Sequence, residues 1–261
     1  MASESKICLF SSNYQILVKQ VGEQYALPTV YDVEKEYDLS LQSDENVMHI
    51  NNDGRDVYYK LLTDALPPQN GFTQSEIRPL FADMQAEDFA DICKARQFVH
   101  WDEYSKYCPR CGERTFLSLP NAKKCPQCQT EFFPPVTPAI IVRIERGEEI
   151  LLVRAHNFRG KHYGLVAGFV EPGETLEECV RREVKEETGL EIADIKYFGS
   201  QPWPFPSGMM IGFTAQYSSG NIVIQEEELA DAAFFSKEKF PELPNKMSIA
   251  RRLIDDWAAK H

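Results

Sequence analysis

The sequence predicts a protein of the α+β class, in which strand-rich and helical segments are divided among more than one domain. Short β-rich runs, separated by turn residues such as those at Asn51–Gly54, fill the first 104 residues. Two pairs of cysteines then lie in a short loop-rich segment, and the last half of the chain alternates apolar strand patterns with two helical patterns. A length of 261 residues leaves room for two domains and a small insert.

The composition excludes several classes of function. Hydrophobic residues make up 43 % of the chain, which is enough for a packed core, and 40 acidic against 28 basic residues give a net charge of −12. This charge excludes broad, salt-driven adhesion to nucleic acid or to an anionic membrane. The first ten residues lack the pattern of a signal peptide, and no apolar run reaches the roughly 18 residues that a membrane span needs. We therefore expect a soluble, cytoplasmic protein with no membrane partner.

Residues 1–104 form the first expected domain, of mixed α/β structure. We expect strands at Ile7–Phe10, Tyr14–Val18 and Val57–Leu62, because β-branched and aromatic residues dominate these runs. Apolar residues at helical spacing predict a helix from about Ala86 to Tyr104.

Four cysteines define the second expected domain, at residues 105–134. Cys108 and Cys111 form one CxxC pair, and Cys125 and Cys128 form another after 13 intervening residues. This is the spacing of a zinc ribbon, in which four thiolates surround one Zn²⁺ at about 2.3 Å and leave no open position, so the ion is structural. A redox CxxC would need only one copy, and a pair of disulfides does not suit a reducing compartment.

Five basic residues close to these cysteines offset the negative charge of a zinc tetrathiolate, or alternatively contact phosphate. They are Lys106, Arg110, Arg114, Lys123 and Lys124.

Residues 135–261 form the third expected domain. The three prolines in residues 131–138 predict an irregular boundary. Strands are expected at Ala139–Ile144 and Ile150–Val153, joined by a turn around Gly147, and again near 209–217 and 221–225. A final helix is expected from about Ser248 to Lys260.

Between these strands, residues 168–190 (GFVEPGETLEECVRREVKEETGL) predict an acidic helix. Thr175 and Glu178 form a capping-box pattern at its start, and Gly189 supplies a C-terminal stop. We expect Arg182 to pair with carboxylates one turn away on either side, at Glu178 and Glu186.

The carboxylates on one face of this helix predict a cation site. Glu183 and Glu187 are four residues apart, with Glu186 beside them, so the like charges repel unless a cation neutralises them. Mg²⁺ and Mn²⁺ prefer such oxygen ligands. A solvated acidic helix is the alternative, and it suits Glu177 and Glu178.

The complete string from Gly168 to Leu190 resembles the Nudix box, the signature of hydrolases that cleave a nucleoside diphosphate linked to a further group. The resemblance implies a Nudix α/β/α sandwich for residues 135–261. The order strand, turn, strand, glycine loop and helix agrees with that expectation.

A proline-rich segment follows the helix at Ser200–Pro206, with the sequence SQPWPFP. Its three prolines predict a rigid, non-helical arm. Trp203 and Phe205 suit packing beside a planar base, and Gln201 can form hydrogen bonds. A proline-stiffened loop that plugs the edge of a core is the alternative.

With the cysteine pairs upstream and this arm downstream, the box resembles the NADH pyrophosphatase branch of the Nudix family, the bacterial NudC-type enzymes. The resemblance covers nearly the whole chain. It implies cleavage of NAD(H) to nicotinamide mononucleotide and AMP, removal of NAD caps from RNA 5′ ends, a homodimer, and catalysis with Mg²⁺ or Mn²⁺. A hydrolase of ADP-ribose or of another nucleoside-diphosphate derivative is the alternative. A non-enzymatic relative would be expected to lose a glutamate of the box or to be strongly basic.

The resemblance also implies roles for single residues. The catalytic cation would be held by Glu183, Glu186, Glu187, Glu228 and the backbone carbonyl of Ala167, with Glu228 acting either as ligand or as base. Substrate contacts are implied for Arg78, Phe133, Phe169, Gln201, Pro202, Trp203, Pro204, Phe205, Pro206, Ser207, Gly208 and Ala250.

Two of these positions depart from the family pattern. Phe133 stands where a tyrosine is common, and Gly208 stands where the family arm usually ends in serine.

Overall fold

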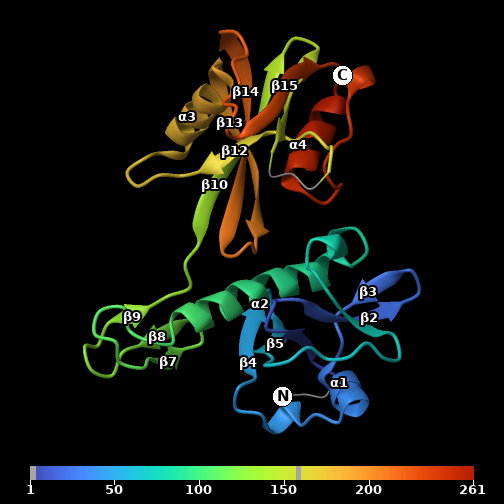
Figure 1. Ribbon diagram of the computed structural model, residues 1–261, viewed down its shortest axis with the longest axis vertical. Helices are drawn as coiled ribbons and strands as arrows, with labels where there is room; N and C mark the ends of the chain where they lie inside the picture. Colours follow the sequence, from blue (N-terminus) through green and yellow to red (C-terminus); the bar gives the residue numbers. More distant parts are fainter. Residues whose placement is uncertain (1–3, 157–159) are drawn as a thin grey trace. The chain divides into compact units, whose positions relative to one another are not determined.

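The computed structural model describes residues 4–156 and 160–261, and the chain divides into two compact units (Figure 1). The first unit contains Met1–Pro135 together with Pro204–Ser207, and the second contains Val136–Trp203 and Gly208–His261. None of the helices among the described residues combines the length and the apolar composition that a membrane span requires.

The first unit is built on a six-stranded sheet of order β3-β2-β1-β5-β4, with β6 pairing to β2. Its strands are β1 (Lys6–Phe10), β2 (Ile16–Val21), β3 (Gln24–Ala26), β4 (Met48–Asn52), β5 (Arg55–Leu61) and β6 (Phe72–Ser75). Its helices are α1 (Val30–Tyr37) and α2 (Ala86–Tyr104), so the helix expected at 86–104 is confirmed.

Buried carboxylates attach α2 to this sheet. Asp88 accepts the backbone N–H of Leu27 at 2.9 Å and pairs with Lys6, while Asp91 pairs with Arg55 at 3.0 Å. Because a buried carboxylate needs such partners, these bonds fix the position of the helix on the strands.

A small three-stranded sheet in the same unit carries the cysteine pairs. It has the order β7-β8-β9, with β7 at Phe116–Leu119, β8 at Ala122–Lys124 and β9 at Glu131–Phe132. Lys123 on β8 is buried and pairs with Asp102 of α2 at 2.6 Å.

The second unit is an α/β/α sandwich, as expected. Its sheet has the order β13-β14-β10-β11-β15, with β12 pairing to β10. The strands are β10 (Thr137–Arg146), β11 (Glu149–Ala155), β12 (Val166–Phe169), β13 (Glu191–Trp203), β14 (Gly208–Ser219) and β15 (Leu229–Phe235). Helices α3 (Leu176–Thr188) and α4 (Ile249–Ala258) cover opposite faces of this sheet (Figure 1).

The alternation of side chains along β10 explains the two layers. Ile140 and Val142 pack in the core under α3, whereas Ile141 packs in the core under α4. Arg143 follows on the α4 face, where it donates to Asp256 at 2.9 Å and to Glu145. Successive residues of a strand point to opposite faces, so a continuous apolar run supplies two cores.

Helix α3 begins and ends where the sequence predicts. Thr175 caps its first turn, with the Thr175 hydroxyl accepting from the Glu178 N–H at 3.2 Å and the Glu178 carboxylate accepting from the Thr175 N–H at 2.8 Å. Gly189 ends the helix with a φ of 72°. The left-handed conformation at this position is the reason for glycine.

Two local expectations are wrong. Residues 221–225 form no strand, because their backbone bonds instead to the end of α3, through Val223 to Thr188 and Gln225 to Glu187. Pro138 does not end regular structure but lies inside β10, opposite Met209. The arm is non-helical, as expected, and its residues 200–203 form the end of the long strand β13.

Candidate active site and cysteine cluster

The predicted ligands Glu183 and Glu187 lie on the inward face of α3. Their residues are only 9 % and 5 % exposed. Gly168 on the neighbouring strand β12 makes room for one of them, since a Cβ atom on Gly168 would overlap the carboxylate of Glu183. Glycine at this position therefore leaves space for the Glu183 carboxylate, which any larger residue would displace.

The surroundings of Glu187 disfavour its charge. Burial, together with the neighbouring carboxylates of Glu183, Glu228 and Glu186, raises its pKa to about 8. Burial also raises the pKa of Glu183, although a hydrogen bond from Arg182 opposes this shift. Among the described residues, no hydrogen bond or ion pair compensates the Glu187 carboxylate. A carboxylate buried in this way is suited to a cation.

Arg182 connects the helix to the glycine loop before it. Its guanidinium contacts Glu174 at 2.7 Å, Glu183 at 2.9 Å and Glu186 at 3.1 Å, and it donates to the carbonyl of Phe169 at 3.0 Å. The arginine thereby fixes the loop and two predicted ligands with one planar group.

The expected pairing of Arg182 with Glu178 is wrong, because Glu178 is already used as the cap partner of Thr175. Glu174 takes that place, and the hydrogen bonds from Arg182 lower the pKa of Glu174 to about 2. Side-chain spacing on the helix could not reveal this pair, because Glu174 precedes the helix.

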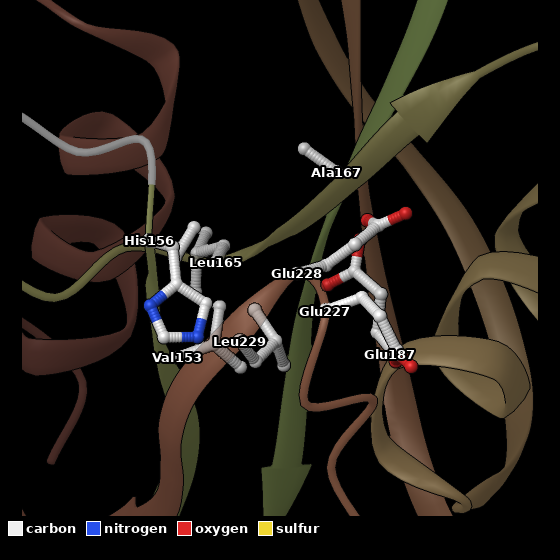
Figure 2. A pocket seen from close by; sticks show the side chains of 9 residues that line it. Val153, His156, Leu165, Ala167, Glu187, Glu227, Glu228 and Leu229 are labelled. Carbon is white, nitrogen blue, oxygen red and sulfur yellow. The ribbon is translucent and has the colours of Figure 1, made fainter.

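Glu228 reaches the same region from the turn before β15. Figure 2 shows the carboxyl groups of Glu187, Glu227 and Glu228 gathered on one side of a cavity of about 380 Å³. The cavity is lined by Val153, Ala155, His156, Leu165, Ala167, Glu187, Glu227, Glu228 and Leu229.

Sequence reasoning missed two polar residues of this cavity. Glu227 is one of three consecutive glutamates, among which the sequence favoured Glu228, and His156 follows the end of β11 with no motif to mark it. Their proximity to Glu187 depends on the pairing of β11 with β15, which places Ala155 opposite Leu229.

The donor set suits a hard divalent cation. It consists of carboxylates with the Ala167 backbone at the same cavity, and Glu187 lacks another positive partner in the described residues. The carboxylate oxygens do not converge as closely as metal ligands, however. Over residues 4–156 and 160–261, only the cysteine group brings three or more ligand atoms within 4.8 Å of one another. Repulsion between like charges accounts for the wider spacing of the glutamates.

The predicted substrate residues of the second unit have different surroundings. Phe169 is 62 % exposed, which leaves its ring face accessible. Gln201 instead uses both ends of its amide within the protein, donating to Met247 at 3.1 Å and accepting from the N–H of Ile249 at 2.8 Å. Ala250 is partly buried and packs against the core under α4.

The predicted arm is a hairpin connection. Pro202 and Trp203 lie on β13 and pair with Met209 and Gly208 of β14. A turn at residues 204–207 joins the two strands, and within it Ser207 is buried.

The arm turn groups with the first unit, as do two further predicted substrate residues. There the guanidinium of Arg78 lies 4.5 Å from the centre of the Phe205 ring, in a cation–π contact. Phe133 is 57 % exposed. Pro204 and Pro206 belong to the same turn.

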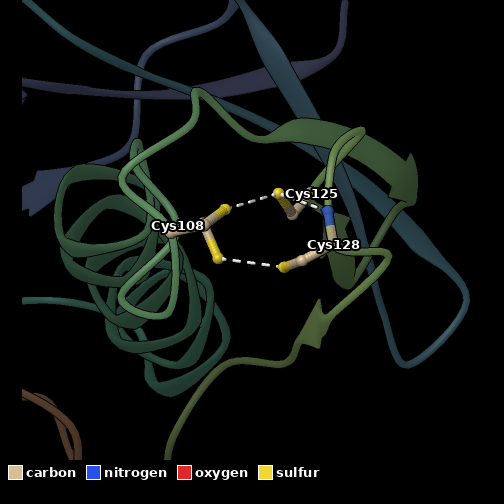
Figure 3. A group of neighbouring side chains, drawn as sticks. Cys108, Cys125 and Cys128 are labelled. Atoms are coloured by element: carbon tan, nitrogen blue, oxygen red, sulfur yellow. Dashed lines mark hydrogen bonds between the residues drawn. The ribbon is translucent and has the colours of Figure 1, made fainter.

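The four cysteines form a compact cluster. The two Sγ–Sγ contacts between the CxxC pairs measure 3.5 Å from Cys108 to Cys128 and 3.4 Å from Cys111 to Cys125 (Figure 3). A tetrahedron with Zn–S bonds of about 2.3 Å has edges of about 3.8 Å, so the cluster has the size of a zinc site. The Thr130 hydroxyl and N–H lower the pKa of Cys128 to about 6, which favours the thiolate that a metal requires.

The other three cysteines are buried thiols outside this cluster, as expected. They are Cys8, Cys93 and Cys179. Burial raises the pKa of the Cys93 thiol to about 12, so it is not a reactive nucleophile.

Comparison with known proteins agrees with these features. The sequence model of the NUDIX domain family matches residues 134–257. The NAD-capped RNA hydrolase NudC of Pseudomonas aeruginosa is 44 % identical over 186 residues, which cover 70 % of this chain and 67 % of that protein. The protein of the same name from Pseudomonas fluorescens (strain Pf0-1) is 38 % identical over 229 residues, covering 87 % of this chain and 81 % of that protein.

A solved structure supports the fold. The crystal structure of a NUDIX hydrolase from Nitrosomonas europaea aligns with a TM-score of 0.51 at 20 % identity, covering 60 % of this chain and 92 % of that chain. With sequence matches over most of its length, the chain belongs to the NudC branch of the Nudix family.

Proposed function

We propose that this protein is a hydrolase that cleaves the pyrophosphate of NAD(H) to nicotinamide mononucleotide and AMP, and that it removes NAD caps from RNA 5′ ends. The observation that carries the proposal is the group of carboxylates around the buried Glu187, which α3 and the turn before β15 bring to one cavity, with Ala167 of β12 beside them. The relatives that match most of the chain bear the name of NAD-capped RNA hydrolases.

Two kinds of metal site belong to this proposal. Glu183, Glu186, Glu187, Glu228 and the carbonyl of Ala167 would hold Mg²⁺ or Mn²⁺, and the four cysteines would hold one structural Zn²⁺. When bound, the divalent cation neutralises pyrophosphate charge and lowers the pKa of a water molecule.

The chain's own residues would orient the reaction. A water oxygen forms a bond to one phosphorus, the bridging P–O bond breaks on the opposite side, and the released mononucleotide takes a proton. Arg182 holds Glu183 and Glu186 in place, and Gly168 lets the Glu183 carboxylate approach the sheet. Glu228 would act as a cation ligand or would accept the proton of the water.

Substrate recognition would use aromatic rings and the proline-rich hairpin. The exposed rings of Phe133 and Phe169 offer faces on which a planar base can stack. Further substrate contacts are proposed for Arg78, Gln201, Pro202, Trp203, Pro204, Phe205, Pro206, Ser207, Gly208 and Ala250. A homodimer and a cytoplasmic location complete the proposal, and light scattering and cell fractionation test them.

Hydrolysis of three substrates tests the proposed function. NADH, ADP-ribose and an NAD-capped RNA are each incubated with Mg²⁺ or Mn²⁺, and the products are identified by mass. We expect nicotinamide mononucleotide and AMP from NADH, and a 5′-monophosphate RNA from the capped RNA. A higher kcat/KM for ADP-ribose than for both others would overturn the proposal in favour of a different Nudix specificity.

The same assay gives two further results. The ratio of kcat/KM for NADH and capped RNA identifies the preferred substrate. Reaction in ¹⁸O-labelled water shows which phosphorus is attacked, because the label enters only one of the two mononucleotides.

A further inference from the structure

Glu228 is carried by a turn that has few contacts of its own. The turn spans residues 225–229 and closes through the N–H groups of Glu228 and Leu229, which donate to the Gln225 carbonyl at 3.0 and 2.9 Å. At its start, the N–H of Gln225 donates to the carbonyl of Glu187 at 3.0 Å, which attaches the turn to α3. The remaining side of the turn faces the end of β11.

His156 holds that side with two hydrogen bonds. Its backbone N–H donates to the carbonyl of Glu228 at 3.0 Å, and its ring Nε2 lies 3.1 Å from the carbonyl oxygen of Glu226. A carbonyl oxygen can only accept, so Nε2 carries the hydrogen in this contact. One residue therefore bonds to the backbone on both sides of Glu227.

The position of His156 in the cavity separates it from the carboxylates. Figure 2 shows its ring on the side of Val153 and Leu229, across from the carboxyl groups of Glu187 and Glu228. In the part of the chain that the structure describes, the contact of its ring nitrogen is with backbone. The ring is thus placed to hold the turn in position.

We propose that His156 is a positioning residue, whose ring holds the turn at 225–229 so that the carboxylates of Glu227 and Glu228 stay beside Glu187. This inference rests on the proposed function, because it concerns the same cation site. The physical need is clear from the charges: three carboxylates on one side of a small cavity repel one another and push an untethered turn outward. Hydrogen bonds that orient metal ligands contribute to affinity even though they do not touch the ion.

A pair of variants of similar shape tests the proposal. His156→Gln keeps a side-chain N–H donor on a flexible chain, whereas His156→Met has nearly the same length and no donor. Binding of Mn²⁺ to the zinc-loaded full-length protein is measured without substrate, from the electron paramagnetic resonance signal of free Mn²⁺. Kinetics with NADH, zinc content and Tm are measured on the same samples.

We expect His156→Met to weaken Mn²⁺ binding about tenfold or more, the effect typical of losing a partner that orients metal ligands. The kcat at fixed Mn²⁺ should fall with it, while KM for NADH stays unchanged. His156→Gln should bind Mn²⁺ nearly as well as the parent protein. His49→Met is the matched control, since His49 is an imidazole of the first unit bonded to Asp56 at 2.8 Å, and it should change neither quantity.

Three results would overturn the proposal. Unchanged Mn²⁺ affinity in His156→Met would show that the ring does not hold the ligands. Equal losses in the Met and Gln variants would assign the effect to the imidazole itself and not to its donor. A raised KM with unchanged Mn²⁺ affinity would make His156 a substrate contact. Because Mn²⁺ binding is measured without substrate, failure of the parent protein to cleave NADH would reject the proposed function and is distinguished from these three results.

Discussion

The described residues contain two groups of potential metal ligands, four cysteines and a set of glutamates, and these groups are assembled in opposite ways. The four cysteines come from one segment between Cys108 and Cys128, and their sulfur atoms already lie within 4.8 Å of one another. The glutamates come from α3 and from a turn some forty residues later, with Ala167 on a third element, and their carboxylates stay further apart. Short-range sequence spacing therefore assembles the thiols, whereas tertiary packing assembles the carboxylates.

This difference matches two chemical roles. A tetrathiolate site with no open position serves the fold, while a cavity with carboxylates on one side leaves room for water and substrate. The surroundings of the two groups also shift the pKa of a ligand in opposite directions. Thr130 lowers the pKa of Cys128 and favours its thiolate, whereas burial raises the pKa of Glu187 and disfavours its carboxylate.

Replacement of a proposed zinc ligand should have the largest effect on structure. Cys125 is fully buried, and Cys125→Ser removes one of four ligands. Binding of structural zinc contributes about 10–16 kcal/mol in isolated zinc-finger peptides, so we expect loss of the metal and of order in residues 105–134. Zinc content by mass spectrometry and proteolytic cleavage within this segment measure both. Cys93→Ala, a thiol outside the cluster, should retain one zinc per chain; if Cys125→Ser also retains it, the cluster is not a zinc site.

Replacement of Glu187 should cause the largest loss of activity, and it should raise the stability of the metal-free protein. We expect Glu187→Gln to lower kcat by about 10²–10⁴-fold, the range for losing a group that activates water. The same change removes a carboxyl that is costly to ionise, so Tm measured without Mg²⁺ or Mn²⁺ should rise by a few degrees at about pH 8. Glu177→Gln, an exposed carboxyl on the same helix, should change neither quantity.

The pH dependence of this effect follows from the sign of the shift. The folded pKa of Glu187 is about 8, above its ordinary value of 4.5. Ionisation therefore costs the folded state free energy as the pH rises from about 5 to about 8, and metal-free stability falls over that window. The Tm advantage of Glu187→Gln should vanish at about pH 5. An equal Tm advantage at both pH values would mean that burial does not raise the pKa of Glu187.

Replacement of Gly168 should have a smaller effect on activity. It tests whether packing of α3 against β12 positions the Glu183 carboxylate. In Gly168→Ala the new methyl group overlaps the Glu183 carboxylate, which must move away from the sheet. We expect Mn²⁺ affinity and kcat to fall about 10- to 100-fold, as for other losses of ligand orientation. Gly199→Ala is the control, because a Cβ on Gly199 meets no atom within 4 Å. Equal activity of the two variants would show that Glu183 can shift without loss.

Elements whose signals are local were predicted well from the sequence. The capping box at Thr175, the stop at Gly189 and the helix at 86–104 all depend on neighbouring residues, and the structure contains each of them. Several strands with distant partners were also predicted, among them Ile7–Phe10 within β1 and Ile150–Val153 within β11, but one such segment was predicted wrongly. Residues 221–225 contain a continuous β-branched run, Ile222 to Ile224, that suggests a strand, but their backbone bonds to the end of α3.

Two pairings at the site were also not predicted from the sequence. The ion pair of Arg182 with Glu174 was missed because it joins the helix to the loop before it. The amide of Gln201 also bonds to Met247 and Ile249 at the start of α4, a helix that follows it by nearly fifty residues. No spacing in the sequence indicates either pairing.

By itself, the sequence determined two local groups of this protein: a cysteine cluster whose spacing fixes its geometry, and a helix whose clustered carboxylates favour a cation. Both depend on residues that lie within about one turn or one hairpin of each other. Only the tertiary structure decided which other groups meet that helix. Pairing of β11 with β15 brings His156 to the turn that carries Glu228, and Gly168 on β12 admits the Glu183 carboxylate. Contacts of this kind depend on strand register and on packing across the sheet, which the local sequence does not encode.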